Sequence, residues 1–400
     1  MEKVVLAFSG GLDTSYCAVH LAKEKNLEVH SVLVNTGGFS AEETEEIEKK
    51  AYALGVKKHK TVDVTERFYN DCVRYLIYGN VLRNGTYPLS VSAERVFQAV
   101  AIADYAQTIG ADYVAHGSTG AGNDQVRFDM IFHTLLPDTE ILTPIRDKRL
   151  SREEEIEYLA AHGIRQNWEK MQYSVNQGLW GTSVGGKETL TSHLPLPEEA
   201  YPTPKTSAPA EKVKIHFERG NFSGFNDRHF DSPVEAVTAL NRLAAPFGIG
   251  RDIHVGDTII GIKGRVGFEA AAPILLIKAH QALEKHTLTK WQLYWKDQLA
   301  NWYGMMLHEG GYFDPVMRDI EQFLEHSQQT VNGTVFIELL PDTFRIEGVE
   351  SPNDLMSAKF GAYGEMNLGW TGDDVRGFAK ILANPMRIYR SVNRKDKEHD

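Results

Sequence analysis

Short apolar runs alternate with helical patterns over roughly the first 165 residues, and few folds accommodate such an order. The run Val4–Phe8 has no polar side chain, which is typical of a strand covered on both faces. Further β-like runs lie at 28–34, 60–64, 112–116 and 141–144, and helical patterns lie at 14–25, 41–54, 65–78, 92–110 and 151–162. This order predicts a doubly wound α/β fold with parallel strands and crossover helices, which binds ligands at the carboxyl ends of its strands.

The rest of the chain has a different pattern. Periodicity fades between about 168 and 209, where prolines are frequent, and we expect an extended connection over the surface. Beyond it we expect an α+β arrangement, with strands at 213–218, 258–263, 335–340 and 343–346 and helices at 233–246 and 273–326. A last helix is expected at 373–382. We therefore divide the chain into domains at 1–167 and 168–370, followed by a helix and tail at 371–400.

Charge and cysteine usage exclude several classes of function. The chain has 43 Lys and Arg against 54 Asp and Glu, a net charge of −11, which argues against a large nucleic-acid footprint. Its two cysteines, Cys17 and Cys72, lack the spacing of a zinc site or a disulfide framework. The first apolar run is too short for a signal sequence or a membrane span. We therefore expect a cytoplasmic protein with no nucleic-acid or membrane partner.

The segment Ser9–Ser15 (Ser-Gly-Gly-Leu-Asp-Thr-Ser) follows the first strand and begins the first helix. Its glycines let backbone N–H groups face a ligand, and the start of a helix favours an anion. Ser9, Thr14 and Ser15 add hydroxyl donors, whereas Asp13 fits if it helps to hold Mg²⁺ or orders the loop. A plain glycine-rich turn is the simpler alternative. The pattern is not a Walker loop, and it resembles the PP-loop of enzymes that split ATP between its α and β phosphates.

A second glycine-rich segment, His116–Phe128 (His-Gly-Ser-Thr-Gly-Ala-Gly-Asn-Asp-Gln-Val-Arg-Phe), follows a later strand. Three glycines let the backbone approach a ligand. Asn123 and Gln125 supply neutral donors and acceptors, and Arg127 supplies a planar fork for a carboxylate. His116 alone is better explained as a structural histidine.

Together, the two segments resemble argininosuccinate synthases. The resemblance extends more loosely to later segments, which are Tyr173–Ser174, Thr182–Ser183, Gly248–Ile253 and Gly264–Arg265. It implies an N-terminal nucleotide-binding domain of the adenine nucleotide alpha hydrolase type at 1–167. It also implies a C-terminal synthetase domain at 168–370, which binds citrulline and aspartate, and a C-terminal oligomerisation helix in a homotetramer.

The resemblance also implies roles for individual residues. ATP would be bound by Ala7, Phe8, Ser9, Gly10, Gly11, Leu12, Asp13, Thr14, Ser15, Val34 and Gly117. L-Aspartate would be bound by Thr119, Asn123 and Asp124, and citrulline by Tyr87, Ser92, Asn123, Arg127, Ser174 and Ser183. The candidate catalytic residues are Asp13, Asp124 and Arg127, and no residue is assigned with certainty as a metal ligand.

The reaction that the resemblance implies belongs to arginine biosynthesis and uses ATP with Mg²⁺. AMP is placed on the ureido oxygen of citrulline, and the amino group of aspartate then displaces it. Such chemistry depends on proximity and charge neutralisation rather than on a protein nucleophile. Asp13 and Asp124 are expected to position the substrates.

Several residues depart from the family pattern. Ala121 replaces a lysine, Gly256 stands where the family has a glutamate, and Phe268 stands where it has a tyrosine. The last two positions normally contact citrulline, so either Asp257 takes over the role of the acid or the substrate has no free ammonium. An N-acylated citrulline would fit the second case, with Lys263 or Arg265 meeting an added carboxylate.

Rival functions remain open from the sequence alone. A tRNA-modifying PP-loop enzyme would need a basic surface or a Cys-x-x-Cys motif, and the sequence has neither. An amide-forming ligase that uses glutamine would need an amidotransferase domain. An ATP-binding sensor on the same scaffold would leave the second glycine-rich segment unexplained.

Overall fold

The computed structural model describes residues 1–166, 168, 173–206, 209–357 and 369–393. The chain divides into two compact units, 1–353 and 354–400. The expected boundary at residue 167 lies outside the described residues, and the expected domain boundaries stay predictions. No described helix is long and apolar enough to cross a membrane.

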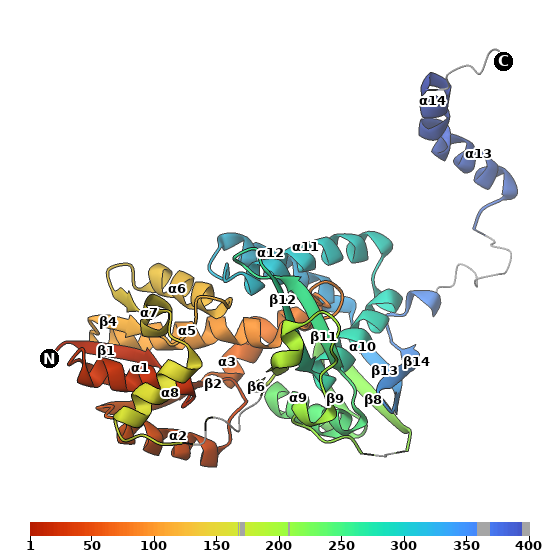
Figure 1. Ribbon diagram of the computed structural model, residues 1–400. Helices are drawn as coiled ribbons and strands as arrows, with labels where there is room; N and C mark the ends of the chain where they lie inside the picture. The colour runs from red at the N-terminus through yellow and green to blue at the C-terminus, as the bar shows by residue number, and fades with distance from the viewer. Residues whose placement is uncertain (167, 169–172, 207–208, 358–368, 394–400) are drawn as a thin grey trace. The chain divides into compact units, whose positions relative to one another are not determined.

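The N-terminal part contains a five-stranded, all-parallel sheet, which confirms the predicted fold class (Figure 1). Its order is β3-β2-β1-β4-β5, and its strands are β1 (Lys3–Ala7), β2 (Glu28–Asn35), β3 (Lys58–Asp63), β4 (Tyr113–Ala115) and β5 (Glu140–Leu142). The order reverses between β1 and β4, and open α/β sheets bind ligands in the crevice at such a point. The two glycine-rich segments follow these two strands.

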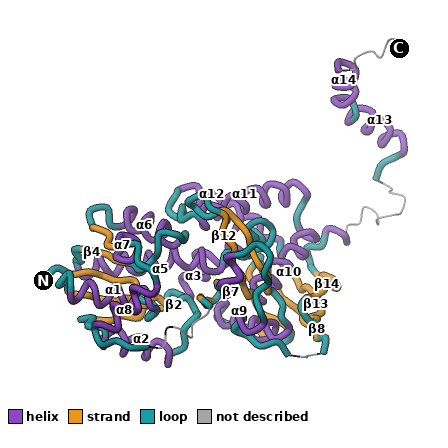
Figure 2. Tube along the Cα trace, in the orientation of Figure 1, coloured by secondary structure: helices purple, strands orange, loops and turns teal. Residues whose placement is uncertain are grey.

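Helices cover both faces of this sheet (Figure 2). Along β1, Val4 and Leu6 share a core with α1 and α8, whereas Val5 shares a core with α3 and α5. A π-helical turn at Tyr69–Val73 joins α3 to α4. The helices of this part are α1 (Leu12–Lys23), α2 (Ala41–Ala53), α3 (Thr65–Phe68), α4 (Arg74–Tyr78), α5 (Ser90–Ile109), α6 (Asp124–Leu135), α7 (Pro144–Lys148) and α8 (Arg152–Ala161).

Two antiparallel sheets follow. The four-stranded sheet has the order β11-β12-β7-β6 and consists of β6 (Ser174–Gly178), β7 (Gly181–Gly185), β11 (Arg251–Asp257) and β12 (Lys263–Glu269). The five-stranded sheet has the order β10-β9-β8-β13-β14 and consists of β8 (Glu211–Glu218), β9 (Asn221–Phe225), β10 (Arg228–His229), β13 (Gly333–Leu340) and β14 (Thr343–Glu350).

Four helices accompany these sheets, namely α9 (Pro233–Ala244), α10 (Ala271–Thr287), α11 (Lys290–His308) and α12 (Pro315–Ser327). One hydrophobic core includes Phe97 from α5, Leu276 from α10 and Val335 from β13. This continuous core explains why residues 1–353 form one unit. The second unit contains α13 (Gly372–Leu382) and α14 (Asn384–Asn393), neither of which has a buried residue.

Three expectations for secondary structure were wrong. The region 168–209 contains the strands β6 and β7, and β7 is largely buried. Residues 258–262 form the turn between β11 and β12 instead of a strand. The single helical stretch expected at 273–326 consists of three helices, and the sequence reading also missed α6, which begins within the second glycine-rich segment.

Candidate active site

Hydrogen bonds from Ser15 and from Lys50 of α2 hold the loop after β1. Gly10 has a φ of 75°, a value that residues with a Cβ rarely adopt, and Lys50 from α2 donates to its carbonyl oxygen. Ser15 is buried and donates to the carbonyl oxygen of Gly11 at 2.7 Å. The hydroxyl hydrogen of Ser15 therefore orders the loop and does not face an anion as expected. The Ser9 and Thr14 hydroxyls lie 3.5 Å apart and are more accessible.

Asp13, in the first turn of α1, is hydrogen-bonded to Glu155 of α8. Burial raises the pKa of both carboxyl groups, and the charge of Asp13 helps to raise the pKa of Glu155 to about 8. Two adjacent carboxyl groups share a proton because both cannot easily be ionised. One Glu155 oxygen is buried and has no hydrogen-bond partner among the described residues.

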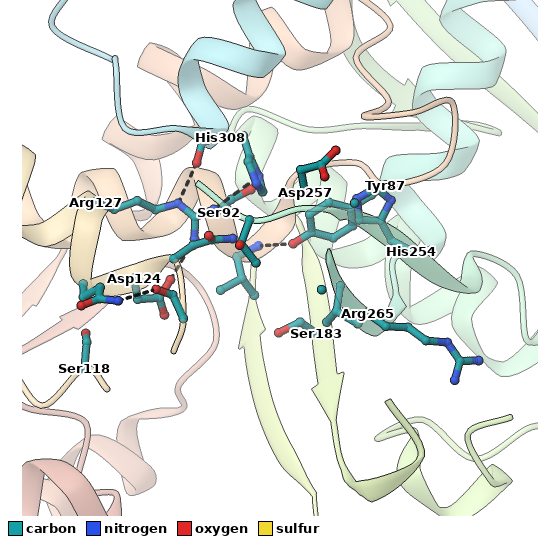
Figure 3. A pocket seen from close by; sticks show the side chains of 18 of the residues that line it. Tyr87, Ser92, Ser118, Asp124, Arg127, Ser183, His254, Asp257, Arg265 and His308 are labelled. Carbon is teal, nitrogen blue, oxygen red and sulfur yellow. Dashed lines mark hydrogen bonds and ion pairs between the residues drawn. The ribbon is translucent and has the colours of Figure 1, made fainter. Parts of the chain in front are cut away.

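The two glycine-rich segments touch each other at the switch point. A Cβ on Gly117 would lie 3.2 Å from the carbonyl carbon of Asp13, so glycine permits this close approach. Beyond it, a cavity of about 440 Å³ opens between the parallel sheet and the four-stranded sheet (Figure 3). Its walls include Asp13, Tyr87, Val91, Ser92, Ser118, Thr119, Gly122, Asn123, Asp124, Gln125, Arg127, Ser183, His254, Gly256, Asp257, Thr258, Gly264, Arg265, Val266 and His308.

Asp124 begins α6 and is bound by two guanidinium groups. Arg95 of α5 donates from Nε to Oδ2 at 2.8 Å, and Arg127 donates from Nη1 to Oδ1 at 2.8 Å. Burial alone would raise the pKa of Asp124, but the two arginines lower it to about 2. Asp124 is therefore ionised at neutral pH, and it also faces the cavity, where it can accept a hydrogen bond from an ammonium group.

Arg127 is fixed by the last residue of α11. Its Nε donates to the carbonyl oxygen of His308 at 2.8 Å, and its Nη2 lies 3.3 Å from His308 Nδ1. With Asp124 on Nη1, three of its five N–H groups have protein partners. The remaining two are available to a ligand, so Arg127 offers less than the free fork that the sequence suggested.

Tyr87 and the start of α5 form another wall. The Tyr87 hydroxyl accepts hydrogen bonds from the Ser90 hydroxyl and the Val91 amide, each at 3.2 Å. Because its oxygen is already an acceptor, its own hydrogen is free to be donated to a ligand. Val91 and Ser92 bring the N-terminus of the helix to the cavity, and α6 does the same with Asp124 and its neighbours. Two positive helix ends therefore favour anionic ligands.

The β11–β12 hairpin covers one side of the cavity. The Ile259 amide at its turn donates to Asn123 Oδ1 at 2.8 Å, which ties the hairpin to α6. The His254 ring stacks on Tyr87 at 5.2 Å between ring centroids. A Cβ on Gly256 would lie 2.6 Å from His254 Nε2, so glycine leaves room for this ring.

Most of the expected aspartate and citrulline residues line this cavity. They are Thr119, Asn123 and Asp124 in the first group, and Tyr87, Ser92, Asn123, Arg127 and Ser183 in the second. Gly256 and Asp257 also line it, whereas Phe268 is buried behind Tyr87 at 5.5 Å between ring centroids. Ser174 lies exposed on the edge strand β6, away from the cavity wall. The functional roles of all these residues stay predictions.

Sequence reasoning missed four residues that shape the site. Arg95 holds Asp124, Lys50 holds the loop, and His254 and His308 line the cavity. Arg95 could have been predicted in part, because it lies one helical turn after Val91 and therefore on the same face of the helix. The other three come from distant elements, and no local pattern marks them.

Oxygen ligands for a magnesium ion are present but few. The described residues contain no group of three His, Cys, Asp or Glu side chains placed to hold a metal. Mg²⁺ is commonly held by one or two carboxylates together with substrate phosphates. Asp13, next to the loop hydroxyls and to the unpartnered oxygen of Glu155, fits that mode of binding.

A five-stranded parallel sheet with a glycine-rich loop at its switch point is typical of α/β nucleotide-binding proteins. The family model "Arginosuccinate synthase N-terminal HUP domain" matches residues 3–165, and "Arginosuccinate synthase C-terminal domain" matches residues 173–389. The chain belongs to the argininosuccinate synthase family.

Relatives that are named argininosuccinate synthase align along nearly the whole chain. The protein of Methanocaldococcus jannaschii is 38% identical over 372 residues, covering 92% of this chain and 93% of the relative. Those of Xanthomonas campestris and Dictyoglomus thermophilum are 36% and 37% identical, covering 98% and 97% of this chain and 99% and 97% of the relatives.

Proposed function

We propose that the protein is an argininosuccinate synthase, a ligase that joins L-aspartate to L-citrulline and converts ATP to AMP and diphosphate. One observation carries the proposal: Asp13, in the first turn of α1, lines the same cavity as Asp124 and Arg127 at the switch point of the parallel sheet. Family membership along nearly the whole chain supports the same reaction. We also propose a cytoplasmic location.

In the first step, the ureido oxygen of citrulline would attack the α-phosphorus of ATP. A carbon–oxygen–phosphorus linkage forms, the bond between the α-phosphorus and the bridging oxygen breaks, and diphosphate leaves. The amides at the start of α1 and the Ser9 hydroxyl would stabilise the phosphates. The Thr14 hydroxyl donates to the Gly11 carbonyl oxygen at 3.3 Å and would have to turn to join them. Asp13 is the residue that would help to hold a Mg²⁺ ion, which when bound would supply positive charge against the phosphates.

In the second step, the aspartate ammonium would first release a proton to the solvent, and the resulting amine would attack the activated carbon, form the new carbon–nitrogen bond and displace AMP. Asp124 would hold the aspartate ammonium, and the two N–H groups of Arg127 that have no protein partner would hold the ureido group or a carboxylate. These contacts would provide proximity, which is the main contribution that such a reaction needs.

Free citrulline is favoured over an acylated substrate. The two cations that were expected to meet an added carboxylate already have partners. Lys263 lies 2.7 Å from Asp257, and Arg265 donates to the carbonyl oxygens of Glu188, Thr191 and Leu194. The relatives are named argininosuccinate synthase, which favours neither the acylated substrate nor a tRNA substrate.

We further propose a homotetramer. The apolar side chains of α13 and α14 are exposed, among them Phe378, Ile381 and Tyr389. α11 also exposes aromatic side chains, including Trp291, Trp295 and Trp302. Exposed apolar faces of this kind mark protein contacts, and sedimentation analysis of the full chain tests the assembly.

The reaction is tested with ATP, Mg²⁺, aspartate and citrulline that carries ¹⁸O in its ureido group. We expect AMP, diphosphate and argininosuccinate in equal amounts, with the ¹⁸O transferred to the phosphate of AMP. Formation of ADP and orthophosphate, or AMP without ¹⁸O, would contradict the mechanism. N-Succinylcitrulline and N-acetylcitrulline are compared under the same conditions, and a clear preference for either would replace citrulline as the substrate.

The citrulline site is tested with two matched substitutions. Ser183→Ala removes a hydroxyl from the cavity wall, whereas Ser174→Ala removes one from the exposed edge of the same sheet. We expect a higher KM for citrulline in the first variant, by about 5- to 10-fold. An equal rise in both variants would place Ser174 in the site as well.

A further inference from the structure

His308 combines a buried position with an unused hydrogen-bonding atom. It ends α11, is 6% exposed and lines the cavity together with Ser92 and Tyr87 (Figure 3). Its carbonyl oxygen and its Nδ1 are both bonded to Arg127. His308 is 181 residues away from Arg127 in the sequence, but the fold brings the two residues into contact at the cavity.

The bond to Arg127 determines the tautomer of the ring. A guanidinium nitrogen has only hydrogens to offer, so Nδ1 must be the acceptor. In a neutral imidazole the proton then resides on Nε2. Burial, and after it the charge of Arg127, lowers the pKa of His308 to about 2, which keeps the ring neutral.

The proton on Nε2 has no partner in the protein. Nε2 is buried and forms no hydrogen bond with any of the described residues. A buried donor without an acceptor is costly, and native proteins leave few of them. Since His308 forms part of the cavity wall, a ligand in the cavity is the natural source of the acceptor.

Building on the proposed function, we propose that His308 is a further substrate-binding residue whose Nε2–H donates a hydrogen bond to an oxygen of the ureido substrate. The acceptor is the ureido oxygen or the α-carboxylate, since these are the oxygens that citrulline presents. A second role follows from the other side of the ring, where Nδ1 and the main chain orient Arg127. His308 would therefore contact the substrate directly through its neutral ring and indirectly by orienting the charged guanidinium group of Arg127.

Two amide substitutions separate the two nitrogens of the ring. His308→Asn places an acceptor near the Nδ1 position for Arg127 but nothing near Nε2, whereas His308→Gln reaches the Nε2 position with an amide donor. We expect about 10-fold weaker binding of citrulline for His308→Asn and less than about 3-fold for His308→Gln. KM values for ATP and aspartate should change little in both. Equal citrulline affinities in the wild type and His308→Asn would overturn the proposal.

Citrullinamide distinguishes the two oxygens. An equal loss for citrulline and citrullinamide in His308→Asn assigns the ureido oxygen, and a smaller loss for the amide assigns the carboxylate. If neither variant folds, ¹⁵N NMR of the wild type still tests the proposal. The proposal requires that His308 carries its proton on Nε2 and that the Nε2 resonance shifts when citrulline binds. A proton on Nδ1 would refute the inference, whereas an inactive wild type would instead refute the proposed function.

Discussion

A buried ion pair fastens α11 to the rest of the protein, and replacing Lys296 with methionine should show how much it contributes. Lys296 and Glu284 of α10 are both fully buried, with 3.0 Å between Nζ and Oε2. Lys296 also donates to the carbonyl oxygen of Tyr78 at 2.9 Å. Glu284 has two further donors, Asn80 at 2.5 Å and Gln328 at 3.0 Å.

The size of the effect follows from these contacts. Lys296→Met removes a charge-assisted hydrogen bond, worth about 1.5–3 kcal/mol, and leaves the Tyr78 carbonyl oxygen without its donor, at about 1–3 kcal/mol. Asn80 and Gln328 still bond Glu284 but do not neutralise its charge. The sum agrees with the ~3–5 kcal/mol that is typical when one partner of a buried pair is removed. We therefore expect the free energy of unfolding to fall by about 4 kcal/mol.

Urea denaturation, followed by tryptophan fluorescence, measures this loss in the full chain. Lys290→Met on the first turn of the same helix is the matched control, because Lys290 is exposed and should change stability by less than about 0.5 kcal/mol. Adding Glu284→Gln to Lys296→Met should recover about 2 kcal/mol, since no unpaired charge is left. A loss below 1 kcal/mol, or a double variant less stable than the single one, would refute the reasoning.

Three further predictions concern the site. The pKa of Glu155 is about 8 in the folded protein and 4.5 for an ordinary glutamate. Between these pH values the folded protein keeps a proton that the unfolded chain releases, so the free energy of unfolding falls as the pH rises. Thermal melts across this pH range should show a smaller fall for Glu155→Gln. Gly256→Ala should displace the His254 ring and raise the KM for citrulline by about 3- to 10-fold without changing that for ATP, which steady-state kinetics would reveal. Arg95→Lys should raise the KM for aspartate by about 10-fold, because a single ammonium replaces the guanidinium that holds Asp124; an unchanged KM would contradict this.

The parallel sheet was predictable because its burial is local. Strands covered on both faces have continuous apolar runs, and Val4, Val5 and Leu6 are indeed fully buried. The same reasoning correctly located the loop at the end of β1, since a strand, two glycines and a helix start lie next to one another in the sequence. A helix or strand can be predicted from the sequence when its apolar side chains recur with the same periodicity over its full length.

The strands β6 and β7 left no such pattern, because β6 is a largely exposed edge strand and the burial of β7 depends on elements that are distant in the sequence. A Cβ on Gly178 would lie 1.7 Å from Glu94 Oε1 of α5, so the glycine marks close packing across the fold, although in the sequence it looks like a flexible connection. At the turn after β11 the opposite error occurred, because a strand was predicted where the structure has a turn. Its β-branched residues suggested a strand, but Thr258 and Ile262 close a turn with hydrogen bonds in both directions.

The acids of the cavity wall have partners, although the chain as a whole is acidic. The net charge is −11, yet ATP, aspartate and the citrulline carboxylate are all anionic. Each acid in the cavity wall has a partner: Asp13 shares a proton with Glu155, Asp124 has two arginines, and Asp257 has Lys263. Distant charges are screened beyond about 8–10 Å, so the ends of α5 and α6 and the free N–H groups of Arg127 dominate at the site. An acidic protein can therefore bind ATP and the carboxylates of aspartate and citrulline side by side, provided that its own carboxylates are neutralised first.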